Sequence, residues 1–131
     1  MFAKLLFGVV VSLTAPAALA AERGTAGLVE TPFTARNAAA SDISCSVSIA
    51  HWYSAELGKA PPGGTIQSSF WSDPASGTLY LLNEVGDRMP VQLTWCGFAG
   101  RSWESRSVLT LARGGATDLT CVSGDTGLTC R

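Results

Sequence analysis

The chain lacks most of the residue patterns that catalysis and metal binding require. Its 131 residues contain one histidine, His51, and neither a Cys-x-x-Cys nor a Gly-x-Ser-x-Gly motif. A serine or cysteine nucleophile needs a neighbouring base, and structural zinc needs clustered thiolates or imidazoles. We therefore expect no catalytic residue, no metal and no cofactor.

Charge and long hydrophobic segments are also scarce. Charged residues make up 15% of the chain, and the formal net charge is −1. Nucleic acids and anionic membranes bind proteins through basic patches, so this balance argues against both as partners. No stretch shows the 3.6-residue periodicity of an amphipathic helix, and no apolar run is long enough to span a bilayer.

The first twenty residues have the pattern of a secretory signal peptide. A positive start at Lys4 precedes the apolar run Leu5–Leu13, and the segment ends in Ala18-Leu19-Ala20. Short apolar runs with a small-x-small end are typical of cleaved signals, and an uncleaved N-terminal anchor is the alternative. We expect a signal peptide over 1–20, a flexible arm over 21–41 and one domain over 42–131.

The rest of the chain predicts an all-β fold. Short segments of alternating polarity are separated by Gly, Pro, Asn and Asp turns, which is typical of a small antiparallel β-sandwich or β-barrel with about six to eight strands. We expect 56–64 to be a loop and 54–59 to form one helical turn at most. The predicted strands are 43–53, 65–72, 78–83, 89–95, 105–112, 119–122 and 128–130.

The stretch from Met89 to Trp103 predicts the central hairpin. Met89, Val91, Leu93 and Trp95 share one parity, so we expect all four on the core face of a strand. Gly97 and Gly100 then bound a turn, which would place Phe98, Arg101 and Trp103 near the hairpin tip.

Four cysteines, an even number in a chain with an export signal, predict a disulfide framework. Three pairings are possible, and we favour Cys45–Cys96 and Cys121–Cys130. On the chain-entropy model, the long loop would contribute about 4 kcal/mol and the short loop about 2.7 kcal/mol. The rival, a metal site, lacks suitable ligand spacing.

Acidic residues leave one catalytic alternative open. Four carboxylates lie at predicted turns or strand ends, and two that converged could act as acid and base in glycoside hydrolysis. Solvated turn carboxylates are the simpler interpretation. The four residues are Asp73, Glu84, Asp87 and Glu104.

Tryptophan is unusually frequent for so small a chain, with four residues. Tryptophan, tyrosine and arginine dominate protein interfaces, and tryptophan also stacks on sugar rings. We therefore expect an exported binding module without catalytic machinery, periplasmic or secreted, that contacts another extracytoplasmic protein in the manner of an inhibitor. A carbohydrate-binding protein is the second hypothesis and a carboxylate-dependent hydrolase the third. The expected contact residues are His51, Trp52, Trp71, Arg101 and Trp103.

Overall fold

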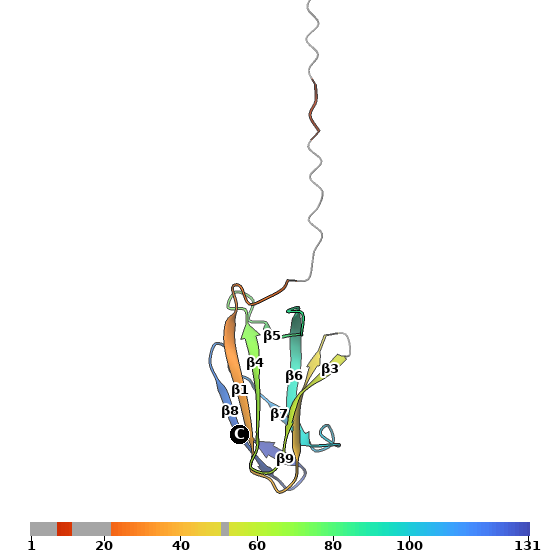
Figure 1. Ribbon diagram of the computed structural model, residues 1–131, viewed down its shortest axis with the longest axis vertical. Helices are drawn as coiled ribbons and strands as arrows, with labels where there is room; N and C mark the ends of the chain where they lie inside the picture. Colours follow the sequence, from red (N-terminus) through yellow and green to blue (C-terminus); the bar gives the residue numbers. More distant parts are fainter. Residues whose placement is uncertain (1–7, 12–21, 51–52) are drawn as a thin grey trace, which may run out of the picture.

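The computed structural model describes residues 8–11, 22–50 and 53–131, and in these residues the regular structure is entirely β (Figure 1). The strands are β1 (Val29–Asn37), β2 (Ile43–Ile49), β3 (Tyr53–Ala60), β4 (Thr65–Ser72), β5 (Leu79–Leu82), β6 (Arg88–Phe98), β7 (Ser107–Leu109), β8 (Thr117–Ser123) and β9 (Leu128–Cys130). No helix among the described residues is long and apolar enough to cross a membrane.

The strands form one open sheet that is folded into two layers. Their hydrogen-bonded order is β3-β2-β6-β5-β4-β1-β8-β9, and β7, off this path, pairs with the later residues of β6. β6 turns the corner: its first residues pair with β5 and its later residues with β2 and β7. The all-β prediction is confirmed. The sheet is mixed, however, because β1 runs parallel to β8, and it has nine described strands.

The predicted flexible arm over 21–41 is wrong for most of its length. Strand β1 lies between β4 and β8, and its Phe33 and Ala35 belong to the core. Polar Thr31 and Asn37 occupy the same inward parity, which conceals the alternation in the sequence. Strand β1 accommodates Pro32 because its pairing with β8 begins only at Phe33. At Pro32 the side of β1 that faces β8 has no ladder hydrogen bond for the missing N–H to make.

The segment predicted as a loop with at most one helical turn is strand β3. It pairs antiparallel with β2 over its whole length, and the register shifts between Cys45 and Ser46, which leaves Leu57 as the extra residue of a bulge. This bulge interrupts the alternation of polarity along Tyr53–Ala60. Because the period-two pattern is broken, the sequence alone does not identify the strand.

A second bulge reverses the face of β6. Ser48 pairs with Leu93 but Ile49 pairs with Val91, so Gln92 is the extra residue. Met89 and Val91 therefore pack against the core as predicted, whereas Trp95 points to the outer side of its layer. The prediction that Leu93 and Trp95 share the core face is wrong for this reason.

The core lies between the two layers and contains both disulfides. Cys45–Cys96 joins β2 to β6, and Cys121–Cys130 joins β8 to β9, so the predicted pairing is confirmed. Each bond links residues that are directly opposite in neighbouring strands. Disulfides form and persist in oxidising compartments, which indicates an extracytoplasmic environment for this domain.

Buried Asn37 connects three segments at one end of the sandwich. Its amide nitrogen donates to the carbonyls of Ser41 (2.8 Å) and Ala60 (3.0 Å), and its amide oxygen accepts from the backbone N–H of Ala39 at 2.9 Å. The side chain is completely buried. Because all three hydrogen bonds are satisfied, this polar group fixes how β1, the following loop and β3 meet.

Candidate contact surface at the loop after β6

The loop between β6 and β7, residues 99–106, carries the clearest candidate site, and we call it the tryptophan loop. It covers Trp95 on the outer side of the β3-β2-β6-β7 layer. Trp103 lies edge-on to Trp95, with ring centroids 5.2 Å apart and an interplanar angle of 80°. Trp95 is 7% exposed, whereas Trp103 is 48% exposed. The buried indole of Trp95 thus supports the exposed indole of Trp103.

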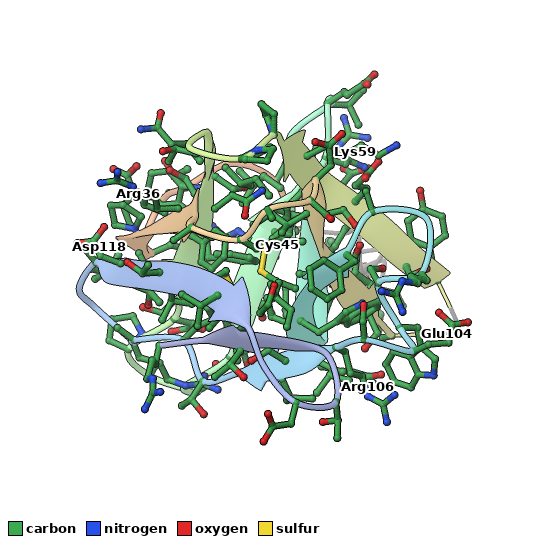
Figure 2. The ribbon with its side chains drawn as sticks, turned by 90° about the horizontal axis from the view of Figure 1, so that it is seen from below. Arg36, Cys45, Lys59, Glu104, Arg106 and Asp118 are labelled. Carbon is green, nitrogen blue, oxygen red and sulfur yellow. A yellow bond between two sulfur atoms is a disulfide. The ribbon has the colours of Figure 1, made fainter. Side chains whose placement is uncertain are left out.

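Arg106 completes the stack on Trp103. Its guanidinium carbon lies 3.9 Å from the centre of the Trp103 ring, and its Nη1 donates to the Trp103 carbonyl at 2.8 Å. The cation is attracted to the π face, and the hydrogen bond restricts the arginine rotamer. Arg106 and the acidic Glu104 lie on the same side of the molecule (Figure 2).

A network around buried Ser105 holds the tryptophan loop in place. The Ser105 hydroxyl accepts from the Phe98 N–H at 2.8 Å and donates to the Arg101 carbonyl at 2.7 Å. The Ser105 carbonyl in turn accepts from the Leu128 N–H at 2.9 Å. At Gly97, an added Cβ would overlap the Ser102 backbone, so the loop packs directly against β6. These contacts make the loop a fixed platform.

Of the three expected contact residues that the structure describes, two lie together. Arg101, whose guanidinium carbon is 5.2 Å from the centre of the Phe98 ring, shares the tryptophan loop with Trp103. His51 and Trp52 lie outside the described residues. The sequence places both Arg101 and Arg106 near an exposed tryptophan, and Arg106 is the one that stacks on the Trp103 ring.

Trp71 is at the other end of the sandwich. It pairs with Glu30 at the start of β1, whereas the tryptophan loop donates its Ala99 N–H to Asp42, which lies beyond the end of β1. On the outer side of its layer, Trp71 is opposite Tyr80. Tyr80 is in turn opposite Pro90, so three rings form a row across β4, β5 and β6.

The four carboxylates expected at turns do not gather in one place. Asp87 forms an ion pair with Arg23 at 2.7 Å, and Glu104 is in the tryptophan loop. The backbone N–H of Ala75 donates to Asp73 and lowers the pKa of that carboxyl below its ordinary 3.8. Glu84 lines a cavity of about 630 Å³ together with Glu56 of β3, and Asp73 lines another of about 370 Å³ beside Arg113. Of the three cavities, the one lined by Glu56 and Glu84 is therefore the one that offers two carboxylates.

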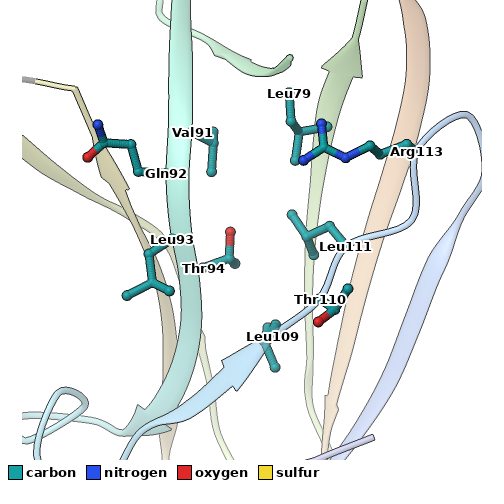
Figure 3. A pocket seen from close by; sticks show the side chains of 9 residues that line it. All are labelled: Leu79, Val91, Gln92, Leu93, Thr94, Leu109, Thr110, Leu111 and Arg113. Atoms are coloured by element: carbon teal, nitrogen blue, oxygen red, sulfur yellow. The ribbon is translucent and has the colours of Figure 1, made fainter. Parts of the chain in front are cut away.

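A smaller cavity of about 200 Å³ lies beside the Gln92 bulge (Figure 3). Val91 and Thr94 of β6 face Leu109 and Leu111 across it, and the Arg113 side chain reaches over it (Figure 3). Its lining contains no carboxylate, imidazole or thiol. It therefore lacks an acid and base pair for hydrolysis.

One group of side chains has the composition of a soft-metal site. The sulfur atoms of Cys96, Cys121 and Cys130 all lie within 4.8 Å of one another. All three are disulfide-bonded, and no cysteine of the chain is free. Metals bind the thiolate form, so the oxidised domain offers no ligand here.

Comparison with protein-family models and with the curated proteins finds no match for this chain.

Proposed function

We propose that this protein is an exported binding module that contacts another extracytoplasmic protein through the tryptophan loop. The observation that carries the proposal is Trp103, a tryptophan with about half its surface exposed that is nevertheless held between Trp95 and Arg106. Water-exposed aromatic surface is a cost to an isolated domain, and binding a partner removes it.

The rigidity of the loop supports a role in recognition. Binding usually requires side chains and loops to lose conformational freedom, and a loop that is already fixed loses less. Ser105 and Gly97 hold the backbone, and Arg106 restricts the Trp103 ring.

The charges of the loop define the kind of partner. Arg101 and Arg106 are both exposed beside Trp103, and Glu104 is the single acidic residue of the loop. Arginine forms planar, bidentate hydrogen bonds with carboxylates. The complementary surface is therefore a partly apolar patch with acidic side chains at its rim.

The test combines partner capture with a matched set of variants. We expect the protein to capture a partner from the extracytoplasmic fraction, and the purified pair to bind about tenfold more weakly after Trp103→Ala or Arg106→Ala. Val122→Ala, which removes an exposed apolar side chain on β8, is the control and should leave binding unchanged. Equal affinity of all four proteins would refute the contact surface.

Export itself rests on two features, the disulfides and the signal-like start of the chain. The residues 1–7 and 12–20 lie outside those described, so the signal peptide over 1–20 stays a prediction. We expect the protein recovered from its compartment to begin at Ala21, and N-terminal sequencing checks this. A cytosolic pool that retains Met1 would contradict export.

The row formed by Trp71, Tyr80 and Pro90 supports a glycan as the second candidate ligand. The backbones of neighbouring strands lie about 4.8 Å apart, so these three side chains can form a strip on which sugar rings stack. Trp71→Ala should then abolish the fluorescence change with a glycan panel, while Trp103→Ala should not. A flat titration of the unmodified protein across the panel removes this candidate.

A further inference from the structure

The two terminal strands of the sheet, β9 and β3, differ in how far their outer backbone edges are hydrogen-bonded. The outer edge of β9 is hydrogen-bonded to the start of β7 and the loop before it. The Leu128 N–H donates to the Ser105 carbonyl (2.9 Å), and the Cys130 N–H donates to the Ser107 hydroxyl (3.0 Å). On the other side, β3 pairs only with β2 among the described strands. Apart from buried Ala60, whose carbonyl accepts from Asn37, the residues of Tyr53–Ala60 therefore present a backbone edge without a further described strand, and a free edge is a template for another strand.

The charges along this edge are self-complementary. Glu56 and Lys59 are both exposed, and both pair with serines of β2 on the outer side of the layer. Within one chain their charged groups lie 3.9 Å apart, a weak exposed ion pair that a second copy can replace. Consider two β3 strands placed antiparallel about the midpoint between Leu57 and Gly58. Glu56 of each copy then lies opposite Lys59 of the other, and the twofold symmetry generates this pair twice.

The same register also places an exposed aromatic residue. Tyr53, at the start of β3, is 60% exposed. In the antiparallel arrangement it approaches the Pro61-Pro62 turn of the second copy, where both prolines are exposed. Ring-to-proline packing would bury apolar surface at both ends of the contact.

We propose that two copies of this chain associate through their β3 edges, so that the β3-β2-β6-β7 layers join into one continuous sheet. Charged residues on an edge strand commonly prevent pairing. Here the two charges have opposite signs and the spacing that brings them together across a twofold axis, so they specify self-pairing. Strand β3 is three positions from β7 in its layer, which leaves both tryptophan loops free at the far ends.

The proposal goes beyond the binding function and does not depend on it. A dimer with two free tryptophan loops would bind a multivalent partner with increased avidity. Loss of dimerisation in a variant that still binds a monovalent partner would separate the two proposals.

A charge-swap series tests the contact by analytical ultracentrifugation of the protein purified with both disulfides formed. We expect a concentration-dependent monomer–dimer equilibrium. Glu56→Lys alone or Lys59→Glu alone places like charges opposite each other twice and should weaken dimerisation about tenfold or more. The double variant Glu56→Lys/Lys59→Glu restores both pairs and should return the dissociation constant to within about threefold of the original.

Matched controls carry the same charge changes on the other side of the molecule. Asp118→Lys and Arg36→Glu alter exposed residues of β8 and β1, which lie away from Lys59 (Figure 2). Both should leave dimerisation unchanged. Circular dichroism spectra and melting temperatures verify that every variant is folded.

Three outcomes would overturn the proposal. The first is a protein that stays monomeric at the highest soluble concentration, which would mean that Glu56 and Lys59 prevent the β3 edge from pairing. The second is a dimer that the single charge reversals do not weaken, which would place the contact elsewhere. The third is a double variant that remains as weak as the single variants.

Discussion

The sulfur of Cys96 lies within 4.8 Å of the sulfur of Cys121, so the two disulfides of the domain are neighbours across the interior of the sandwich. Each bond joins strands within one layer, and their proximity brings the layers together. Cys130 belongs to the same group of sulfurs, whereas Cys45 lies outside it. Cys96 is therefore the cysteine of its disulfide that lies within reach of the second disulfide.

Replacing Cys45 with serine should cause disulfide exchange. The freed Cys96 thiolate can attack either sulfur of the Cys121–Cys130 bond; a new disulfide forms and the displaced cysteine leaves as a thiolate, so no oxidant is consumed. Peptide mapping without reduction should find Cys96 joined to Cys121 or Cys130. Cys96→Ser is the control, because it frees Cys45 instead and should retain Cys121–Cys130. Identical maps for the two variants would contradict the prediction.

Gly97→Ala should destabilise the domain by about 2 kcal/mol or more, because the added methyl group overlaps the Ser102 backbone and displaces the tryptophan loop. Urea denaturation measures the loss, and near-ultraviolet circular dichroism reports the environment of Trp95 and Trp103. Gly115→Ala, where a Cβ meets open space, is the matched control and should cost nothing. A Gly97→Ala protein as stable as the control would show that the loop is not packed on β6.

Asn37→Ala should cost about 3 kcal/mol in the free energy of unfolding. The change leaves two backbone carbonyls and one N–H without their hydrogen-bond partner, and those of Ala60 and Ala39 are buried. Arg36→Ala, one residue earlier on the exposed side of β1, should change stability by less than about 0.5 kcal/mol. Chemical denaturation of both variants gives the comparison, and equal losses would argue against the Asn37 network.

Arg88→Ala should release the segment before β1. The Arg88 side chain, which is 10% exposed, donates to the carbonyls of Gly24 (2.8 Å) and Ala26 (2.7 Å) and pairs with Glu22 at 2.9 Å. Without it, amide hydrogen exchange at Gly24 should accelerate, since its N–H bonds to the neighbouring Gly86 carbonyl. Arg23→Ala removes an exposed ion pair, and we expect little change. An unchanged rate of amide hydrogen exchange at Gly24 in Arg88→Ala would show that Arg88 does not hold this segment in place.

Local patterns in the sequence were sufficient for part of this fold. Strands β4 and β9 have the predicted bounds, because uninterrupted alternation and flanking turn residues define them. The hairpin of β6 and β7 was predicted with Phe98, Arg101 and Trp103 at its tip, and both disulfides were predicted correctly. Turn chemistry is local and the cysteine count predicts two bridges, whereas the choice among the three possible pairings needed the structure.

Tertiary structure decided what the alternation of polarity could not. The inward positions of β1 include Thr31 and Asn37, and Asn37 is tolerated there only because partners from β3 and the following loop satisfy it. The bulges at Leu57 and Gln92 depend on the pairing of neighbouring strands.

The candidate site shows the same division. The sequence by itself determined that Trp103 and Arg101 lie in a turn and that the cysteines join in two pairs. Only the folded sheet decided that Trp95 faces outward, because the Gln92 bulge shifts the register by one residue and each such shift moves the following side chains to the opposite face. That shift places Trp95 beneath Trp103 and creates the stacked surface.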